Sequence, residues 1–170
     1  KRFVANLEWE SFGGPGSGRA PKRPADAWEQ KPSTFTCCGL RIHALPVWHG
    51  SDYVCFGFAF GAEGSKTVYL SDYTALTPPT EALLTSWAAR GAIDLLVLDA
   101  LRITDAHPVH ATAEESIDLA RRLRPRRCLL VGMGHAMEHE ATNRELRRLW
   151  RDERLDVQLA YDGQFVSIQF

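Results

Sequence analysis

The stretch PVWHGSDYVCFGFAFG, Pro46–Gly61, followed shortly by VYLSD, Val68–Asp72, decides the fold of this chain. Its apolar and aromatic runs are separated by Gly-containing turns, a pattern typical of short strands joined by tight connections. Worked outward, the pattern predicts strands over Leu40–Val47, Tyr53–Phe60 and Thr67–Asp72. Because these strands follow one another with short gaps, we expect an antiparallel meander.

Beyond this meander, helical and strand patterns alternate. Helices are predicted over Pro78–Arg90, Thr112–Leu123 and Glu138–Arg151, and strands over Ile93–Leu101 and Arg127–Met133, ahead of a closing hairpin of Leu155–Tyr161 and Gln164–Phe170 across Asp162-Gly163. Thr112 and Glu115 fit a capping box at the start of the second helix. The chain is therefore predicted to be a layered α/β domain with helices on one face of its sheet and a second sheet needed on the other.

The amino-terminal region has a different composition. RFVANLEW, residues 2–9, predicts a short strand, and residues 10–33 are rich in Gly, Pro and charge, which is typical of a flexible surface insertion. A length of 170 residues favours one domain over residues 1–170. Since the chain begins with Lys1 rather than Met, we expect a fragment, a cleaved product or a split subunit.

Composition argues against several classes of partner. A net charge of -1 and a pI near 6.7 give no electrostatic case for nucleic acid or an anionic membrane. No stretch approaches the roughly 20 apolar residues of a membrane span. The cysteines, at positions 37, 38, 55 and 128, form no C-x-x-C pair, and Cys55 and Cys128 are predicted to be small core residues. The lack of a disulfide framework favours a reducing intracellular compartment, cytoplasmic or organellar.

Three side chains with metal-binding chemistry follow predicted strands. His49 and Asp72 come after strands of the meander, and His135 follows a buried strand and precedes a helix. Strand ends that lead into loops are where α/β proteins gather functional groups, and imidazole with carboxylate suits zinc, iron or manganese. Each residue alone is also a common cap or core residue, and no HxH pair occurs in the chain. The residues by themselves leave both interpretations open.

The order of motifs adds a resemblance to a known family. PVWHGSDYVCFGFAFG, then VYLSD, LLVLDALR, a His before a helix and a closing YDG together resemble hydrolases of the metallo-β-lactamase superfamily. The subgroup that they resemble is that of PhnP-like phosphodiesterases, with its plant and algal relatives. The resemblance implies the C-terminal half of a metallo-β-lactamase-type αβ/βα sandwich, and it covers the chain from about Val4 to Phe170.

The resemblance also implies roles for individual residues. His49 matches a ligand of a first metal ion, Asp72 a carboxylate that bridges two ions, and His135 a ligand of the second ion. His110 matches a residue that lies near the substrate phosphate as general acid or phosphate contact; by itself it is equally interpreted as a helix-flanking residue bonded to backbone. The implied cofactor is a pair of divalent metals, zinc, manganese or iron.

One departure from the family pattern affects the functional hypothesis. The HxHxDH motif that supplies the other metal ligands is absent from this sequence. We therefore expect an upstream N-terminal half or a second chain to complete the sandwich and the site, and we expect this chain alone to be inactive. The expected substrate is a small phosphodiester or a nucleotide-like molecule, with nucleic acid and membrane disfavoured. The alternative is a catalytically degenerate structural subunit of a larger assembly.

Overall fold

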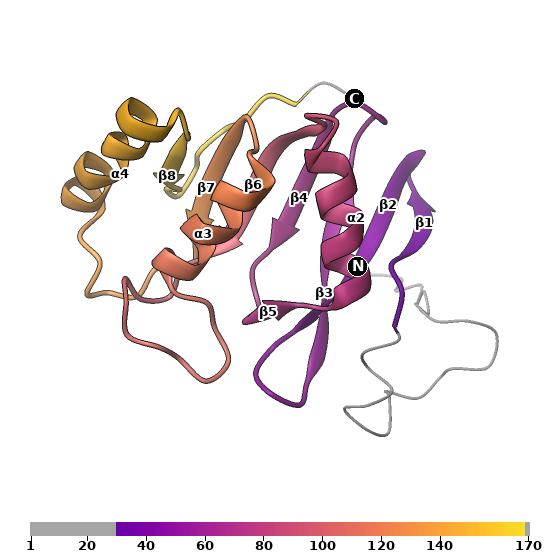
Figure 1. Cartoon of the computed structure of the whole chain (residues 1–170), viewed down its shortest axis with the longest axis horizontal. Helices are drawn as coiled ribbons and strands as arrows, with labels where there is room; N and C mark the ends of the chain where they lie inside the picture. Colours follow the sequence, from indigo (N-terminus) through magenta and orange to yellow (C-terminus); the bar gives the residue numbers. More distant parts are fainter. Residues whose placement is uncertain (1–29, 169–170) are drawn as a thin grey trace, which may run out of the picture.

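The computed structural model describes residues 30–168, which form one mixed sheet with three flanking helices (Figure 1). The strands are β1 (Ser33–Cys37), β2 (Leu40–Trp48), β3 (Val54–Phe60), β4 (Lys66–Leu70), β5 (Ala75–Leu76), β6 (Ile93–Asp99), β7 (Arg127–Val131) and β8 (Val157–Leu159). The helices are α2 (Pro78–Ala88), α3 (Ala113–Leu123) and α4 (His139–Glu153). The strand order is β1-β2-β3-β4-β6-β7-β8, with β5 paired to β2. The predicted α/β fold class is confirmed.

The first half of the sheet is the predicted antiparallel meander. β2 pairs with β3 and β3 with β4, each antiparallel, as the short gaps indicated. The sequence did not predict β1, which adds to the outer edge of β2 through a tight turn at Cys38 and Gly39. Both turn residues have positive φ, 51° and 79°, a conformation that Gly adopts readily.

The second half of the sheet is parallel, running from β4 through β6 and β7 to β8. Parallel neighbours end at the same edge of a sheet, so β4, β6 and β7 share their carboxyl edge. β2 ends at that edge too, because it is antiparallel to β3, which is antiparallel to β4. The loops that follow β2 and β6 lie along the lower edge of the molecule in Figure 1. The topology thus brings together the loops that carry the candidate residues.

One face of the sheet packs against all three helices. The main core combines sheet residues such as Val68, Leu96 and Leu130 with buried residues of each helix, among them Leu84 of α2, Leu119 of α3 and Leu146 of α4. Figure 1 shows α2 and α3 lying across the near face, with α4 beside β8. The predicted capping box of Thr112 and Glu115 starts α3. The prediction of one helical face is confirmed.

The opposite face carries a much smaller cluster. Leu95, Val97 and Leu129 form it, and Val166 and Ile168 of the carboxyl-terminal segment pack against it. The predicted closing hairpin is therefore wrong in its second strand. The first predicted strand contains β8, which pairs in parallel with β7, but the described residues after the turn at Gly163 form no strand. Val166 and Ile168 pack on the sheet surface instead, which removes apolar area from water.

Two predictions fall outside the described part of the chain. The strand over residues 2–9 and residues 10–29 of the predicted insertion both lie there, whereas β1 begins at Ser33, the last position of that insertion. Among residues 30–168, no helix combines the length and the apolar character that crossing a bilayer requires.

Candidate metal centre

Three side chains meet at the carboxyl edge of the sheet. His49 follows β2, Asp72 follows β4, and His110 lies in the loop between β6 and α3. Each offers one ligand atom, and these atoms all lie within 4.8 Å of one another. Nδ1 of His110 is 4.0 Å from a carboxylate oxygen of Asp72. Residues from three separate loops of the chain therefore form one local group.

Hydrogen bonds from neighbouring residues hold the backbone that carries the first two of these side chains. The backbone N–H of His49 donates to the carbonyl of Tyr53 at 2.8 Å, which closes the turn after β2. Thr74 ties that turn to the segment after β4: its backbone N–H donates to the carbonyl of Trp48 at 2.7 Å. The Cys55 thiol donates to the backbone carbonyl of Asp72 at 2.7 Å. Burial raises the pKa of Cys55 to about 11, so the sulfur keeps its proton at neutral pH.

Asp99 orients the third side chain. Its carboxylate lies 2.6 Å from Nδ1 of His110 and its side chain is only 2% exposed. Burial raises the pKa of the Asp99 carboxyl above its usual range, and the hydrogen bond with His110 opposes that shift. The Ser116 hydroxyl donates to the backbone carbonyl of Asp99 at 2.6 Å. The Asp99 carboxylate thus holds Nδ1 of the partly buried His110 ring, and no hydrogen bond of Nε2 is seen within the described residues.

A glycine makes room for the Asp99 carboxylate. Gly132, just after β7, has a φ of 74°, and a Cβ built there would lie 2.5 Å from Oδ1 of Asp99. Any larger residue would displace the carboxylate from its place beside His110. The requirement for glycine at this position is therefore steric as well as conformational.

The donor set suits a divalent cation. Nδ1 of His49 is buried and has no hydrogen-bond partner within the described chain, so it is an unsatisfied polar atom that a bound group would satisfy. Two imidazoles and one carboxylate are a ligand set found with zinc and with non-haem iron. A catalytic metal site holds about three protein ligands, with water or substrate in the next position, so His49 and Asp72 need at least one further ligand, from His110 or from elsewhere.

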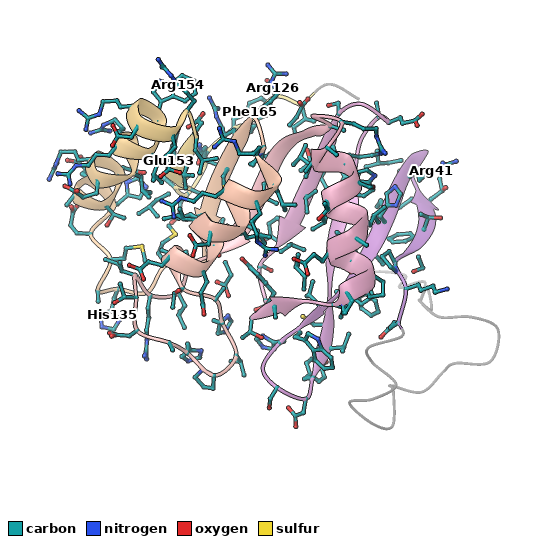
Figure 2. All side chains as sticks on the ribbon, in the orientation of Figure 1. Arg41, Arg126, His135, Glu153, Arg154 and Phe165 are labelled. Atoms are coloured by element: carbon teal, nitrogen blue, oxygen red, sulfur yellow. The ribbon has the colours of Figure 1, made fainter. Side chains whose placement is uncertain are left out.

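The structure places the other predicted ligand, His135, outside this group. It is exposed on the loop between β7 and α4 (Figure 2). β6 separates β4 from β7 in the sheet order, so a residue after β7 follows a strand about 10 Å from β4 along the edge. His135 is thus at the same edge of the sheet but is not part of the three-residue group.

The remaining histidines, which match no family ligand, have other surroundings. The His107 ring lies 5.2 Å from the His110 ring, at the rim of the group. The His43 ring packs edge-on against Trp87 at 5.1 Å, and Nε2 of His139 lies 3.1 Å from the Ala160 carbonyl oxygen. The contacts of His43 and His139 are of a structural kind.

The sequence did not single out Asp99 or Gly132. The signal for Asp99 was its place at the carboxyl end of the apolar run Ile93–Leu101, where a carboxylate breaks the pattern. That break could have identified Asp99 as a functional candidate, although not its pairing with His110.

Comparison with known proteins assigns the chain to a family. A model of the beta-lactamase superfamily domain matches residues 16–133, more than half of the chain. No protein in a search of curated sequences matches. Among solved structures, a diphosphatase from the PhnP family superposes with a TM-score of 0.63 at 30% sequence identity, over 78% of this chain and 44% of that chain.

Two further solved structures share the fold. Human tRNase Z, short form, has a TM-score of 0.54 and 20% identity, over 80% of this chain and 46% of that chain. The metallo-beta-lactamase fold protein YhfI from Bacillus subtilis has a TM-score of 0.56 and 16% identity, over 78% and 50%. The chain therefore spans about half the length of these structures. By its match to the family model and by its fold, the chain belongs to the beta-lactamase superfamily.

Proposed function

We propose that this chain is the C-terminal half of a metal-dependent hydrolase that acts on a phosphodiester. In this proposal an upstream segment or a partner chain supplies the HxHxDH half of the site. The observation that carries it is the group of His49, Asp72 and His110, whose ligand atoms lie within 4.8 Å of one another at one sheet edge. The 30% identity to a PhnP-family diphosphatase supports a phosphorus-containing substrate.

Each residue of the group has a distinct role in the proposal. His49 and Asp72 would hold a metal ion, and the exposed carboxylate of Asp72 would also be available to a second ion. A divalent ion held there supplies a water molecule whose pKa is lowered to near neutrality. His135, farther along the same edge, is the candidate ligand of the second ion.

His110 acts as a proton donor in this scheme. Its Nδ1 is bonded to the buried Asp99 carboxylate at 2.6 Å, which fixes the orientation of the ring. Nε2 then carries the proton that passes to the leaving oxygen of the substrate. Because Asp99 acts through His110 and not on the reacting atoms, it is a positioning residue.

The proposed partner segment follows from the ligand count. Dinuclear hydrolases hold ions roughly 3.5–4 Å apart, and each ion needs about three protein ligands. His49, Asp72 and His135 provide three side chains for two ions, so ligands from elsewhere are required. The lightly covered face of the sheet offers the surface against which a second layer would pack.

The alternative is a structural subunit whose partial site holds no metal. The absence of HxHxDH from this sequence favours it. It predicts that no chain associated with this one carries that motif and that the assembly contains no bound metal.

Elemental analysis of the purified assembly tests the proposal, together with turnover of bis(p-nitrophenyl) phosphate. We expect His49→Ala and Asp72→Ala to lower the metal content and abolish turnover. We expect His110→Ala to retain the metal and to lower turnover by about 10²–10⁴-fold, the usual contribution of a general acid.

His43→Ala is the matched control, because His43 lies on the same strand β2 and contacts Trp87 rather than the group. It should leave the metal content unchanged. Equal metal content in the wild type, His49→Ala and Asp72→Ala would refute the ligand assignment. Bound metal without turnover of bis(p-nitrophenyl) phosphate would refute the phosphodiesterase, whereas an assembly without bound metal would favour the degenerate subunit.

A further inference from the structure

A second polar site lies at the far edge of the sheet, away from the metal-binding group. Helix α4 and the edge strand β8 enclose a groove of about 760 Å³. Its lining residues are Asn143, Arg144, Leu146, Arg147, Trp150, Arg151, Asp156, Val157 and Gln158. This volume falls within the range of roughly 300–1,000 Å³ that is typical of small-molecule sites.

The groove is cationic. Arg144, Arg147 and Arg151 are spaced i, i+3 and i+7 along α4 and so share one side of the helix. Arg147 and Arg151 have no ion pair within the described chain, and Arg144 reaches Glu140 only at 4.0 Å. Like charges four residues apart on a helix repel each other, so a bound anion would relieve that repulsion.

Other arginines of the same region already have acidic partners. Arg121 pairs with Glu153 at 2.8 Å, and Arg148, on α4 itself, pairs with Glu145 at 2.7 Å. The one carboxylate of the groove, Asp156, is also occupied: Arg127 donates to it at 3.0 Å and the Gln158 amide at 2.7 Å. The groove therefore retains positive charge that no acidic side chain of the described residues neutralises, unlike Arg121 and Arg148 nearby.

Trp150 supplies an aromatic surface beside these charges. Its side chain is 51% exposed, although large apolar groups are normally buried. The Arg154 guanidinium lies 5.7 Å from the ring centroid, and Arg154 is not part of the groove lining. The guanidinium of Arg154 thus lies against the Trp150 ring from outside the groove, while the ring also lines the groove. A planar group bound in the groove could stack on this ring.

The strand edge itself favours a small ligand over an added strand. Alternate residues of β8 face β7, as the bonds from Cys128 to the Asp156 carbonyl and from Ala160 to the Leu130 carbonyl show. The outward N–H of Leu159 already donates to the Asn143 side chain at 2.8 Å. Of the outward N–H groups of β8, this leaves only that of Val157 for the groove, too little for pairing with an extended peptide.

We propose that this groove binds a nucleoside monophosphate, with the phosphate dianion on Arg147 and Arg151 and the base stacked on Trp150. Guanidinium groups bind phosphate through charge-assisted hydrogen bonds, and base–aromatic stacking tolerates any base. The proposal does not depend on the hydrolase function, because no groove residue belongs to the metal-binding group.

Isothermal titration calorimetry of the 170-residue chain at low ionic strength tests it, with EDTA present. The probes are adenosine 5′-monophosphate, adenosine and inorganic phosphate. We expect the nucleotide to bind at least about tenfold more tightly than either part alone, since phosphate and base contacts combine. The double variant Arg147→Gln/Arg151→Gln should weaken nucleotide binding by at least about tenfold. Trp150→Leu should weaken nucleotide binding but leave phosphate binding unchanged.

Two matched variants locate the binding. Arg148→Gln changes the charge of α4 by the same amount as each groove substitution but lies outside the groove, so it should leave the affinity unchanged. Asp72→Ala should also leave it unchanged, because the nucleotide would not occupy the metal-binding group.

Three outcomes would overturn the proposal. The first is that the nucleotide does not bind, and the second is that Arg148→Gln weakens nucleotide binding as much as the groove variants do. The third is that a hexaglutamate peptide binds more tightly than the nucleotide.

Discussion

The two faces of the sheet differ in how completely this chain buries them. On the helical face, Leu96 and Leu130 are fully buried within a core that draws on all three helices. On the opposite face, the buried cluster is small: it consists of Leu95, Val97 and Leu129, with a few residues of the carboxyl-terminal segment packed against it. The chain therefore builds a full core on one face and only a thin cover on the other.

The difference bears on the candidate site. Side chains alternate along a strand, so Asp99 shares its side of β6 with Leu95 and Val97, on the lightly covered face. Phe165, in the carboxyl-terminal segment, is 89% exposed. The metal-binding group thus lies at the margin of the face that this chain covers least. A second layer that packed on this face would also reach the metal-binding group. We therefore expect the segment that covers the face to supply the missing metal ligands as well.

The largest expected loss of stability is at β7, where the neighbouring residues Leu129 and Leu130 point to opposite faces of the sheet. We expect Leu130→Ala to lower the free energy of unfolding by about 3–4 kcal/mol, because it leaves a cavity in the main core. Leu129→Ala should cost only about 2 kcal/mol in this chain alone, because its cluster is small and its surroundings can collapse. Urea unfolding of both variants measures the difference.

Measuring Leu129→Ala and Leu130→Ala again in the presence of the proposed partner segment tests whether that segment covers the opposite face. If a second layer packs on the opposite face, the cost of Leu129→Ala should rise toward that of Leu130→Ala. Equal costs in the isolated chain would contradict the difference between the faces.

A smaller effect is expected at two glycines that share a positive φ. Gly163→Ala meets no atom within 4 Å and should cost about 1 kcal/mol from backbone strain alone. Gly132→Ala adds a clash with Asp99 and should cost about 1–2 kcal/mol more. Thermal unfolding compares the two, and Gly132→Ala should also disturb the His110 imidazole resonances in NMR spectra. Equal costs and an unchanged His110 would show that Gly132 makes no room for the carboxylate.

The smallest effect, and the one that depends on pH, is expected for Asp99→Asn. Burial raises the pKa of Asp99 in the folded chain, so its contribution to stability is present below the unfolded pKa and is lost as the pH rises through the folded value. Asparagine does not ionise. The stability of Asp99→Asn relative to the wild type should therefore increase between about pH 4 and pH 7, as urea unfolding at both pH values would measure. A decrease over that interval would contradict the direction of the shift.

Much of the fold was predictable because its signals are local. The apolar run Ile93–Leu101 and the capping box at Thr112 each depend on a few neighbouring residues. The closing hairpin was not predictable in this way. Asp162-Gly163 does form a turn, but whether the next residues pair or pack depends on how much apolar sheet surface lies nearby.

The candidate site was predictable in part. His49 and Asp72 were identified because they follow strands, and the structure brings them together with His110. His135 was identified by the same reasoning, but the sheet order separates it from the group by the width of β6. A residue's place after a strand predicts at which edge of the sheet the residue lies. It does not predict how far along that edge the residue is from the others.

The sequence by itself determined which segments form helices and strands, which residues follow them, and the family pattern that they resemble. Only the tertiary structure decided that β6 lies beside β4, that Asp99 orients His110 and that Gly132 leaves space for the Asp99 carboxylate. The physical reason is the distance along the chain over which each interaction acts. Backbone preferences and hydrophobic periodicity act over a few residues, whereas strand order and side-chain pairing are set by which surfaces the whole chain buries against one another.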